Sequence, residues 1–132
     1  MPLPLSVMIV DDDWDVTYLF RLYLARLGFD SITFTEPKSA LAHFQQNSGR
    51  YGLVLLDWRM PRLDGLELAK KMRKHNSQVK ILFITAYFVH DLIEKHNLMQ
   101  AQNTDVMLKP IKLKDLEARI EQLHLRDVDT RI

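Results

Sequence analysis

Five short, mainly apolar runs, separated by segments with helical periodicity, constrain the fold of this 132-residue chain more than any other feature. Such runs, with no polar alternation, are typical of strands that are buried on both faces of a sheet. Strands that alternate with helices predict a parallel sheet covered on both faces, and right-handed crossovers make it doubly wound. The five predicted strands are Val7–Val10, Ile32–Phe34, Leu53–Leu56, Ile81–Ile84 and Val106–Leu108.

Helical periodicity predicts a helix after each of these strands. In the first, apolar side chains share one helix face from Val16 to Leu27, and Gly28 is the expected C-cap. The second helix is expected to begin at Thr35-Glu36-Pro37 and the third at Asp64-Gly65. The fourth is expected to span about residues 88–100, and the fifth to run from Leu113 to Leu123.

Length and composition indicate one domain over residues 1–132, with a core of about 5–125 and with 126–132 as a tail or the start of a linker. The net charge of +1 gives no support for a general nucleic-acid binder. No cysteine is present, which excludes disulfides, and no apolar run approaches the roughly 18 residues that span a bilayer. We expect a cytoplasmic protein.

Polar residues follow four of the five predicted strands. Asp11-Asp12-Asp13 follows the first, Asp57 the third, Thr85 the fourth and Lys109-Pro110 the fifth. The carboxyl ends of parallel strands meet at one edge of the sheet, where ligands bind. Carboxylates about 4 Å apart repel by roughly 4 kcal/mol per pair, so a cation is expected among them, and Mg²⁺ suits carboxylate ligands. An aspartate in such a site is a candidate nucleophile for a phosphoryl group.

These residues together resemble the receiver domain of two-component response regulators. The matching elements are the acid pair in Val10-Asp11-Asp12, the Asp-x-x-Met-Pro-x-x-Asp-Gly segment from Asp57 to Gly65, Thr85-Ala86 and Lys109-Pro110. The resemblance covers about residues 5–125. It implies an α/β fold of the flavodoxin-like (βα)5 type, with a five-stranded parallel sheet in the order 2-1-3-4-5.

The resemblance also implies a role for each site residue. Asp57 would accept a phosphoryl group from a histidine kinase or phosphotransfer protein, and Thr85 and Lys109 would contact phosphoryl oxygens. Mg²⁺ would be bound by Asp12, by Asp57 and by the main-chain carbonyl of Arg59. Asp11 would hold a water on the metal, and the Lys109–Pro110 bond would be cis.

A protein of this kind is not an enzyme beyond its own phosphorylation and dephosphorylation, and it relays the signal by a conformational switch. From the charge and the apolar runs, we expect no membrane contact and no direct nucleic-acid binding by this chain. The resemblance also implies a possible homodimer through the fourth helix, the fifth strand and the fifth helix.

Three positions are expected to tune the switch. Arg59 and Tyr87 stand two residues beyond Asp57 and Thr85, where bulky side chains would hinder the hydrolytic water. Val106 stands where the family has an aromatic residue that reorients after the threonine moves. Gln102-Asn103-Thr104 replaces the usual Gly-Ala, and the 24-residue interval from Thr85 to Lys109 is about two residues longer than the family pattern.

Two other functions compete with this interpretation. One is a phosphatase of the haloacid dehalogenase type, because Asp13-Trp14-Asp15-Val16-Thr17 spells the Asp-x-Asp-x-Thr motif of those enzymes. Against it, Asp13 does not follow its strand directly. The other is a receiver-like module that signals without phosphorylation, although such modules usually lack one of the Asp, Thr and Lys residues.

Overall fold

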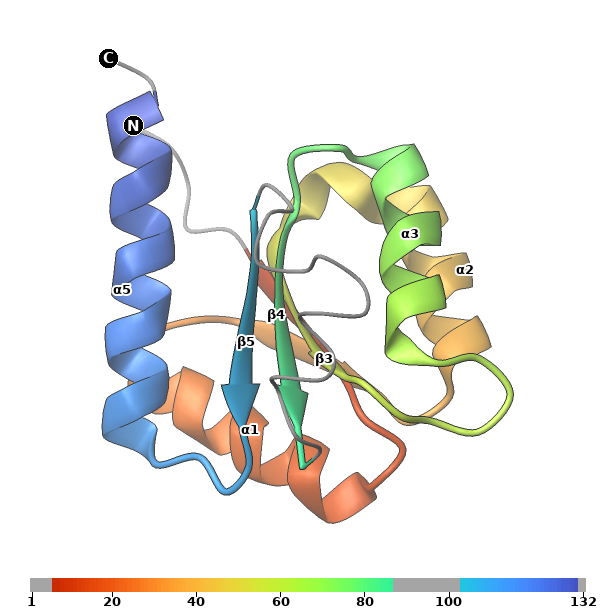
Figure 1. Cartoon of the computed structure of the whole chain (residues 1–132), viewed down its shortest axis with the longest axis horizontal. Coiled ribbons are helices and arrows are strands. Elements are labelled where there is room, and N and C mark those ends of the chain that lie inside the picture. The colour runs from red at the N-terminus through yellow and green to blue at the C-terminus, as the bar shows by residue number, and fades with distance from the viewer. Residues whose placement is uncertain (1–5, 87–102, 131–132) are drawn as a thin grey trace.

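A single parallel sheet of five strands, in the order β2-β1-β3-β4-β5, forms the centre of the molecule (Figure 1). The structure is a computed structural model, which describes residues 6–86 and 103–130, with side chains up to Leu123. The elements are β1 Ser6–Val10, α1 Trp14–Arg26, β2 Ser31–Phe34, α2 Pro37–Asn47, a 3-10 turn Ser48–Arg50, β3 Tyr51–Asp57, α3 Gly65–His75, β4 Lys80–Thr85, β5 Thr104–Leu108 and α5 Leu113–Thr130. The predicted fold class and strand order are confirmed, and the helix predicted over about residues 88–100 lies outside the described residues.

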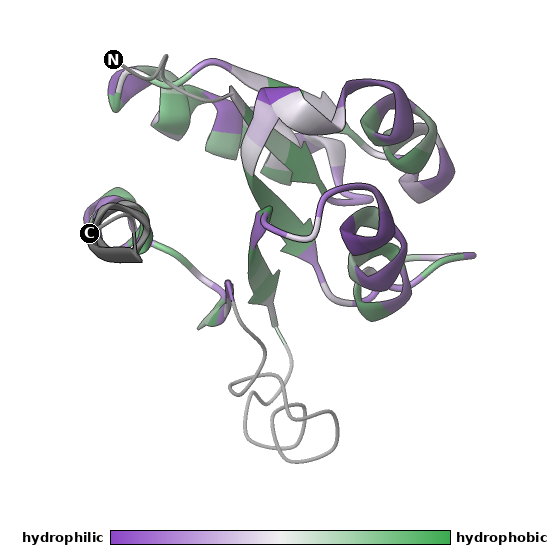
Figure 2. Ribbon diagram, turned by 90° about the horizontal axis from the view of Figure 1, so that it is seen from above, coloured by the Kyte–Doolittle hydropathy of each residue, from purple (hydrophilic) through white to green (hydrophobic). Residues whose placement is uncertain are grey.

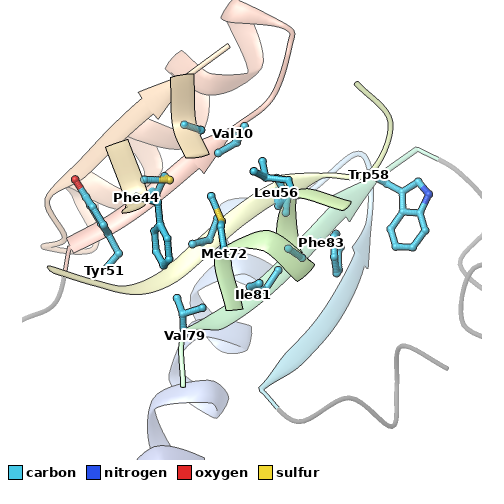
Figure 3. Packing of buried hydrophobic residues seen from close by; sticks show 14 of the residues in the cluster. Val10, Phe44, Tyr51, Leu56, Trp58, Met72, Val79, Ile81 and Phe83 are labelled. Atoms are coloured by element: carbon cyan, nitrogen blue, oxygen red, sulfur yellow. The ribbon is translucent and has the colours of Figure 1, made fainter. Parts of the chain in front are cut away.

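Strands β1, β3, β4 and β5 send alternate side chains into two hydrophobic cores, one on each face of the sheet, and β2 contributes to only one of them. Leu56 and Phe83 point into the core beneath α2 and α3, which Figure 3 shows. Leu55 and Ile84 point into the core beneath α1 and α5. Figure 2 shows the strands as mainly hydrophobic between helices that carry hydrophilic residues. The buried strands therefore behave as the apolar runs predicted.

Aspartates cap two helices at the carboxyl edge of the sheet, and a glycine follows the end of α1 at the opposite edge. Asp13 is the N-cap of α1, and its side chain accepts a hydrogen bond of 3.0 Å from the backbone N–H of Asp15. Asp64 caps α3 in the same way, through the N–H of Glu67. The C-cap of α1 is Leu27, and Gly28 follows it with a φ of 90°, so the predicted end of this helix is one residue off.

The fifth strand begins two residues earlier than the apolar run predicted. Thr104 and Asp105 both lie in β5 and are buried. An aspartate is unusual inside a strand, and here Arg119 of α5 lies 2.9 Å from its carboxylate. The charge is therefore compensated by a residue distant in the sequence. None of the described helices has the length and apolar character needed to cross a membrane.

Candidate functional site

The central strands bring three carboxylates together at one edge of the sheet. Val10 of β1 lies beside Leu56 of β3, so the next residues, Asp11 and Asp57, lie side by side at the edge of the sheet. One oxygen from each of Asp11, Asp12 and Asp57 lies within 4.8 Å of the others. Asp11 is buried, Asp57 half-buried and Asp12 exposed, so the cluster opens to solvent on the side of Asp12.

Lys109 brings a positive charge from the end of β5 into this cluster. Its Nζ lies 2.9 Å from Oδ2 of Asp11 and 3.7 Å from Oδ1 of Asp57. Its backbone N–H donates a 2.7 Å hydrogen bond to the carbonyl of Thr85, a fully buried residue at the end of β4. The Lys109–Pro110 bond is cis, which confirms that prediction. The ends of four strands therefore meet where the sequence predicted.

Burial and charge perturb the protonation of the cluster. Burial first, and then the negative charge of Asp11, raise the pKa of Asp57 to about 7. Burial also raises the pKa of Asp11, although the N–H of Asp13 and the ammonium of Lys109 oppose the shift. Burial alone would lower the pKa of Lys109, but its two carboxylate partners raise it. Asp57 thus carries its negative charge only partly at neutral pH when no metal is bound.

The donor set fits a hard divalent cation. All three clustered side chains are carboxylates, and one of them faces solvent, where water can complete an octahedral shell. No other group of three or more metal-ligating side chains occurs among the described residues. Arg59, whose main-chain carbonyl was predicted as a metal ligand, lies two residues after Asp57 in the loop that follows β3, and its side chain is exposed.

The loop from Trp58 to Asp64 is held tightly against the end of β3. The N–H of Gly65 donates a 2.7 Å hydrogen bond to the carbonyl of Trp58. A Cβ added at Gly65 would lie 2.3 Å from the carbonyl oxygen of Asp57. Glycine is therefore required because the helix begins in contact with the backbone of the site. Sequence reasoning identified the Asp-Gly pair as a helix start, but not this contact.

The Asp-x-Asp-x-Thr sequence forms the start of a helix. Asp13 caps α1, Asp15 stands in the first turn, and the hydroxyl of Thr17 donates to the carbonyl of Trp14 at 2.8 Å. The metal-ligating cluster contains Asp11 and Asp12 but neither acid of this motif. The geometry gives no support to the phosphatase alternative.

The predicted tuning residues are only partly described. Val106 lies in β5 beside Phe83 of β4 and belongs to the core under α3. The Phe83 ring meets Trp58 edge-on, with ring centroids 5.0 Å apart. Figure 3 labels both side chains. Tyr87 lies outside the described residues. Trp58, which follows Asp57, thus contacts Phe83, and Phe83 in turn lies beside Val106 of β5.

Comparisons with known proteins agree with this geometry. The family model "Response regulator receiver domain" matches residues 7–121. A probable transcriptional regulator, ycf27, of Porphyridium aerugineum is 32% identical over 94% of this chain and 49% of its own length. The chain thus spans about half the length of the curated relatives it matches.

Solved structures share the fold. The response regulator TrrA of Thermotoga maritima, solved in complex with Mg²⁺-BeF, is 28% identical with a TM-score of 0.76, covering 90% of this chain and 98% of TrrA. The chemotaxis protein CheY4 of Vibrio cholerae has a TM-score of 0.80 at 22% identity, covering 92% of this chain and 99% of its own, which supports the fold alone.

Proposed function

Because this chain belongs to the response regulator receiver domain family of two-component systems, we propose that it accepts a phosphoryl group on Asp57 and relays the signal by a conformational switch. The observation that carries the proposal is the position of Asp57. It ends the central strand, and its carboxylate lies beside two further acids and a lysine ammonium.

Each residue of the site has a separate task in this transfer. An oxygen of Asp57 forms the bond to phosphorus while the bond from phosphorus to the donor nitrogen breaks, which leaves an acyl phosphate. Lys109, 3.7 Å from Asp57, would stabilise the negative charge of the transferred group, with the hydroxyl of Thr85 beside it. Asp11 positions the ammonium of Lys109 through their 2.9 Å contact.

The metal requirement follows from the charge of the cluster. Asp12, Asp57 and the carbonyl of Arg59 would hold Mg²⁺, with Asp11 binding one of its waters. Bound there, the ion would offset the carboxylate charges and favour the ionised form of Asp57. The half-buried position of Asp57 next to the exposed Asp12 leaves an approach for both the cation and the phosphodonor.

The donor would be a histidine kinase or a phosphotransfer protein, as for other members of the family. The chemistry of the receiver is limited to its own phosphorylation and dephosphorylation. Cytoplasmic location, the tuning roles of Arg59 and Tyr87, and a homodimer through the fourth helix, β5 and α5 stay predictions.

Intact-mass measurement after incubation with acetyl phosphate and Mg²⁺ tests the proposal. Wild-type protein should gain one phosphoryl group, and Asp57→Asn should gain none. Asp13→Asn is the matched control, because asparagine also caps a helix and should leave the yield unchanged. Omission of Mg²⁺ or addition of EDTA should reduce the yield strongly.

Two results would contradict the proposal. An equal yield in Asp57→Asn would place the phosphoryl group elsewhere. A wild-type protein that stays unmodified by acetyl phosphate and by phosphorylated histidine donors would favour a module that signals without phosphorylation. Repeated turnover of a small phosphate ester would instead support the alternative function, a phosphatase.

A further inference from the structure

The outer face of α1 carries an exposed hydrophobic surface, which consists of Trp14, Tyr18, Leu19 and Leu22. These four side chains are between 43% and 65% exposed. Among the described residues, Leu108 is the only other large hydrophobic side chain with comparable exposure. The surface is therefore concentrated on one helix, whereas exposed hydrophobic residues that occur singly need no explanation.

The inner face of α1 is hydrophobic as well. Phe20 and Leu24 are buried against the sheet in the core shared with α5. A surface helix normally has one apolar stripe and a polar outer face, as in α3, where the outer face carries Glu67, Lys70 and Lys71. A helix that is apolar on both faces is typical of one covered on both sides, and no described residue covers the outer face of α1.

The exposed side chains form an ordered ridge. Trp14, Tyr18 and Leu22 are spaced four residues apart, so they lie in one row along the helix. The rings of Trp14 and Tyr18 stack with centroids 5.5 Å apart and planes 9° from parallel. Rows with this spacing are the ridges that pack against the same rows of a second helix.

Charges at the two ends of the surface have opposite signs. Asp15 stands in the first turn of α1 and Arg26 in the last. Neither forms an ion pair with another described residue. If a second α1 lies antiparallel across the first, each Asp15 faces the other copy's Arg26, and Tyr18 faces Leu22. The surface is thus complementary to itself, which is what a two-fold interface requires.

We propose that two copies of this chain pair antiparallel through the outer faces of α1. The occupant is a second copy because one short helix supplies both the apolar ridge and the two charges that complement each other under a two-fold axis. This interface differs from the one predicted through β5 and α5, and the proposal does not depend on phosphorylation.

The interface is small, so the pairing should be weak. The four side chains expose roughly 400 Å² per copy, about half of the ~800 Å² that each partner buries in a standard interface. A dissociation constant of roughly 0.1–1 mM is expected, and the dimer should form only at high protein concentration.

Sedimentation equilibrium between roughly 10 µM and 1 mM protein, a range that extends from well below this constant to its upper limit, tests the proposal. Wild-type mass should rise from monomer towards dimer, and Leu22→Glu should weaken the association about tenfold or more, because a charge is placed in the centre of an apolar contact. Gln45→Glu adds the same charge on the exposed side of α2 and is the matched control. Circular dichroism of both variants confirms that they fold.

A charge exchange tests the orientation. Arg26→Glu alone should weaken pairing, since the introduced carboxylate would then face Asp15 of the other copy, and Asp15→Arg with Arg26→Glu should restore it. A monomer throughout the range would overturn the proposal and leave a different protein, such as the phosphodonor, as the occupant. A dimer unaffected by Leu22→Glu would also overturn it and place the interface elsewhere. Neither result bears on whether Asp57 is phosphorylated.

Discussion

When no metal is bound, the carboxylate of Asp57 lowers the free energy of unfolding at neutral pH. Its pKa is about 7 in the fold against 3.8 in the unfolded chain. The folded state therefore holds the proton more tightly, and stability falls as pH rises from about 4 to about 7. The carboxylate that we propose as the nucleophile thus destabilises the fold in the absence of a cation.

Asp57→Asn should remove this cost. In EDTA at pH 8, the free energy of unfolding should exceed that of the wild type by about 1–3 kcal/mol, and the difference should vanish near pH 4. Urea unfolding at pH 4, 6 and 8 measures it. Asp30→Asn, an exposed residue of the α1–β2 loop, should have little effect at any pH. A variant less stable than the wild type at pH 8 would contradict the shifted pKa.

Gly65→Ala should damage both the fold and the site. The added methyl group would lie 2.3 Å from the carbonyl oxygen of Asp57, so β3 or α3 must move, at a cost of about 1–3 kcal/mol. Phosphorylation by acetyl phosphate should also slow. Gly49→Ala is the control, because nothing lies within 4 Å of its added Cβ. Equal stability of the two variants would show that the contact is absent in solution.

Among the elements, the strands were the most predictable. The apolar runs located all five, because strands with a layer of helices on each face carry mainly hydrophobic side chains, although the edge strand β2 is only half-buried. Their ends were less predictable. β5 begins at Thr104 and includes Asp105, whose charge is compensated by Arg119 from another element. A pairing between residues far apart in the chain leaves no local signal in the sequence.

The response to phosphorylation should be strongest before β5. Val106 has no ring to reorient, and it packs beside Phe83, which already contacts Trp58. We expect a beryllofluoride mimic to perturb residues 85–100 more than residues 104–125. Backbone amide shifts or hydrogen exchange, with and without the mimic, measure this. Large changes centred on Val106 and α5, with residues 85–100 unchanged, would show that the aromatic residue is dispensable.

For the whole molecule, binding of Mg²⁺ should stabilise the fold. The three carboxylates converge only in the folded chain, so a ligand there binds the native state alone, adding about 2.7 kcal/mol at a hundred times its dissociation constant. The thermal midpoint should rise with Mg²⁺ concentration, and the fluorescence of the buried Trp58 should change with it. Affinity should rise with pH between 6 and 8, since the ion competes with the proton on Asp57.

Two neighbouring residues of Asp11-Asp12-Asp13 provide a matched pair of variants that test the stabilisation by Mg²⁺. Asp12→Ala should reduce the Mg²⁺-dependent stabilisation most. Asp13→Ala should lose about 1 kcal/mol of stability as a missing helix cap and keep the response to Mg²⁺. If Asp13→Ala lost the response and Asp12→Ala kept it, the assignment of the acid pair would be off by one residue.

The sequence predicted which residues lie together in the site, but it did not predict which of them contact one another. Residues that follow parallel strands must meet at one edge, so Asp11, Asp57, Thr85 and Lys109 could be grouped from the sequence. The 2.9 Å contact of Lys109 with Asp11, closer than its contact with Asp57, depends on how the strand ends are spaced. Only the assembled sheet determines that spacing.

The alternation of side chains along β3 has a consequence for the evolution of the site. Asp57 emerges at the functional edge while its neighbour Trp58 enters the core, because successive residues face opposite sides. Loss or gain of one residue within β3 would exchange the two, placing an indole at the edge and a carboxylate among hydrocarbons. The position of Asp57 is therefore tied to the register of β3, because even a shift of two residues, which restores the facing, would move the carboxylate by about 6–7 Å along the strand. Substitutions that keep β3 apolar leave Asp57 in place beside Asp11, whereas an insertion or deletion within the strand moves it.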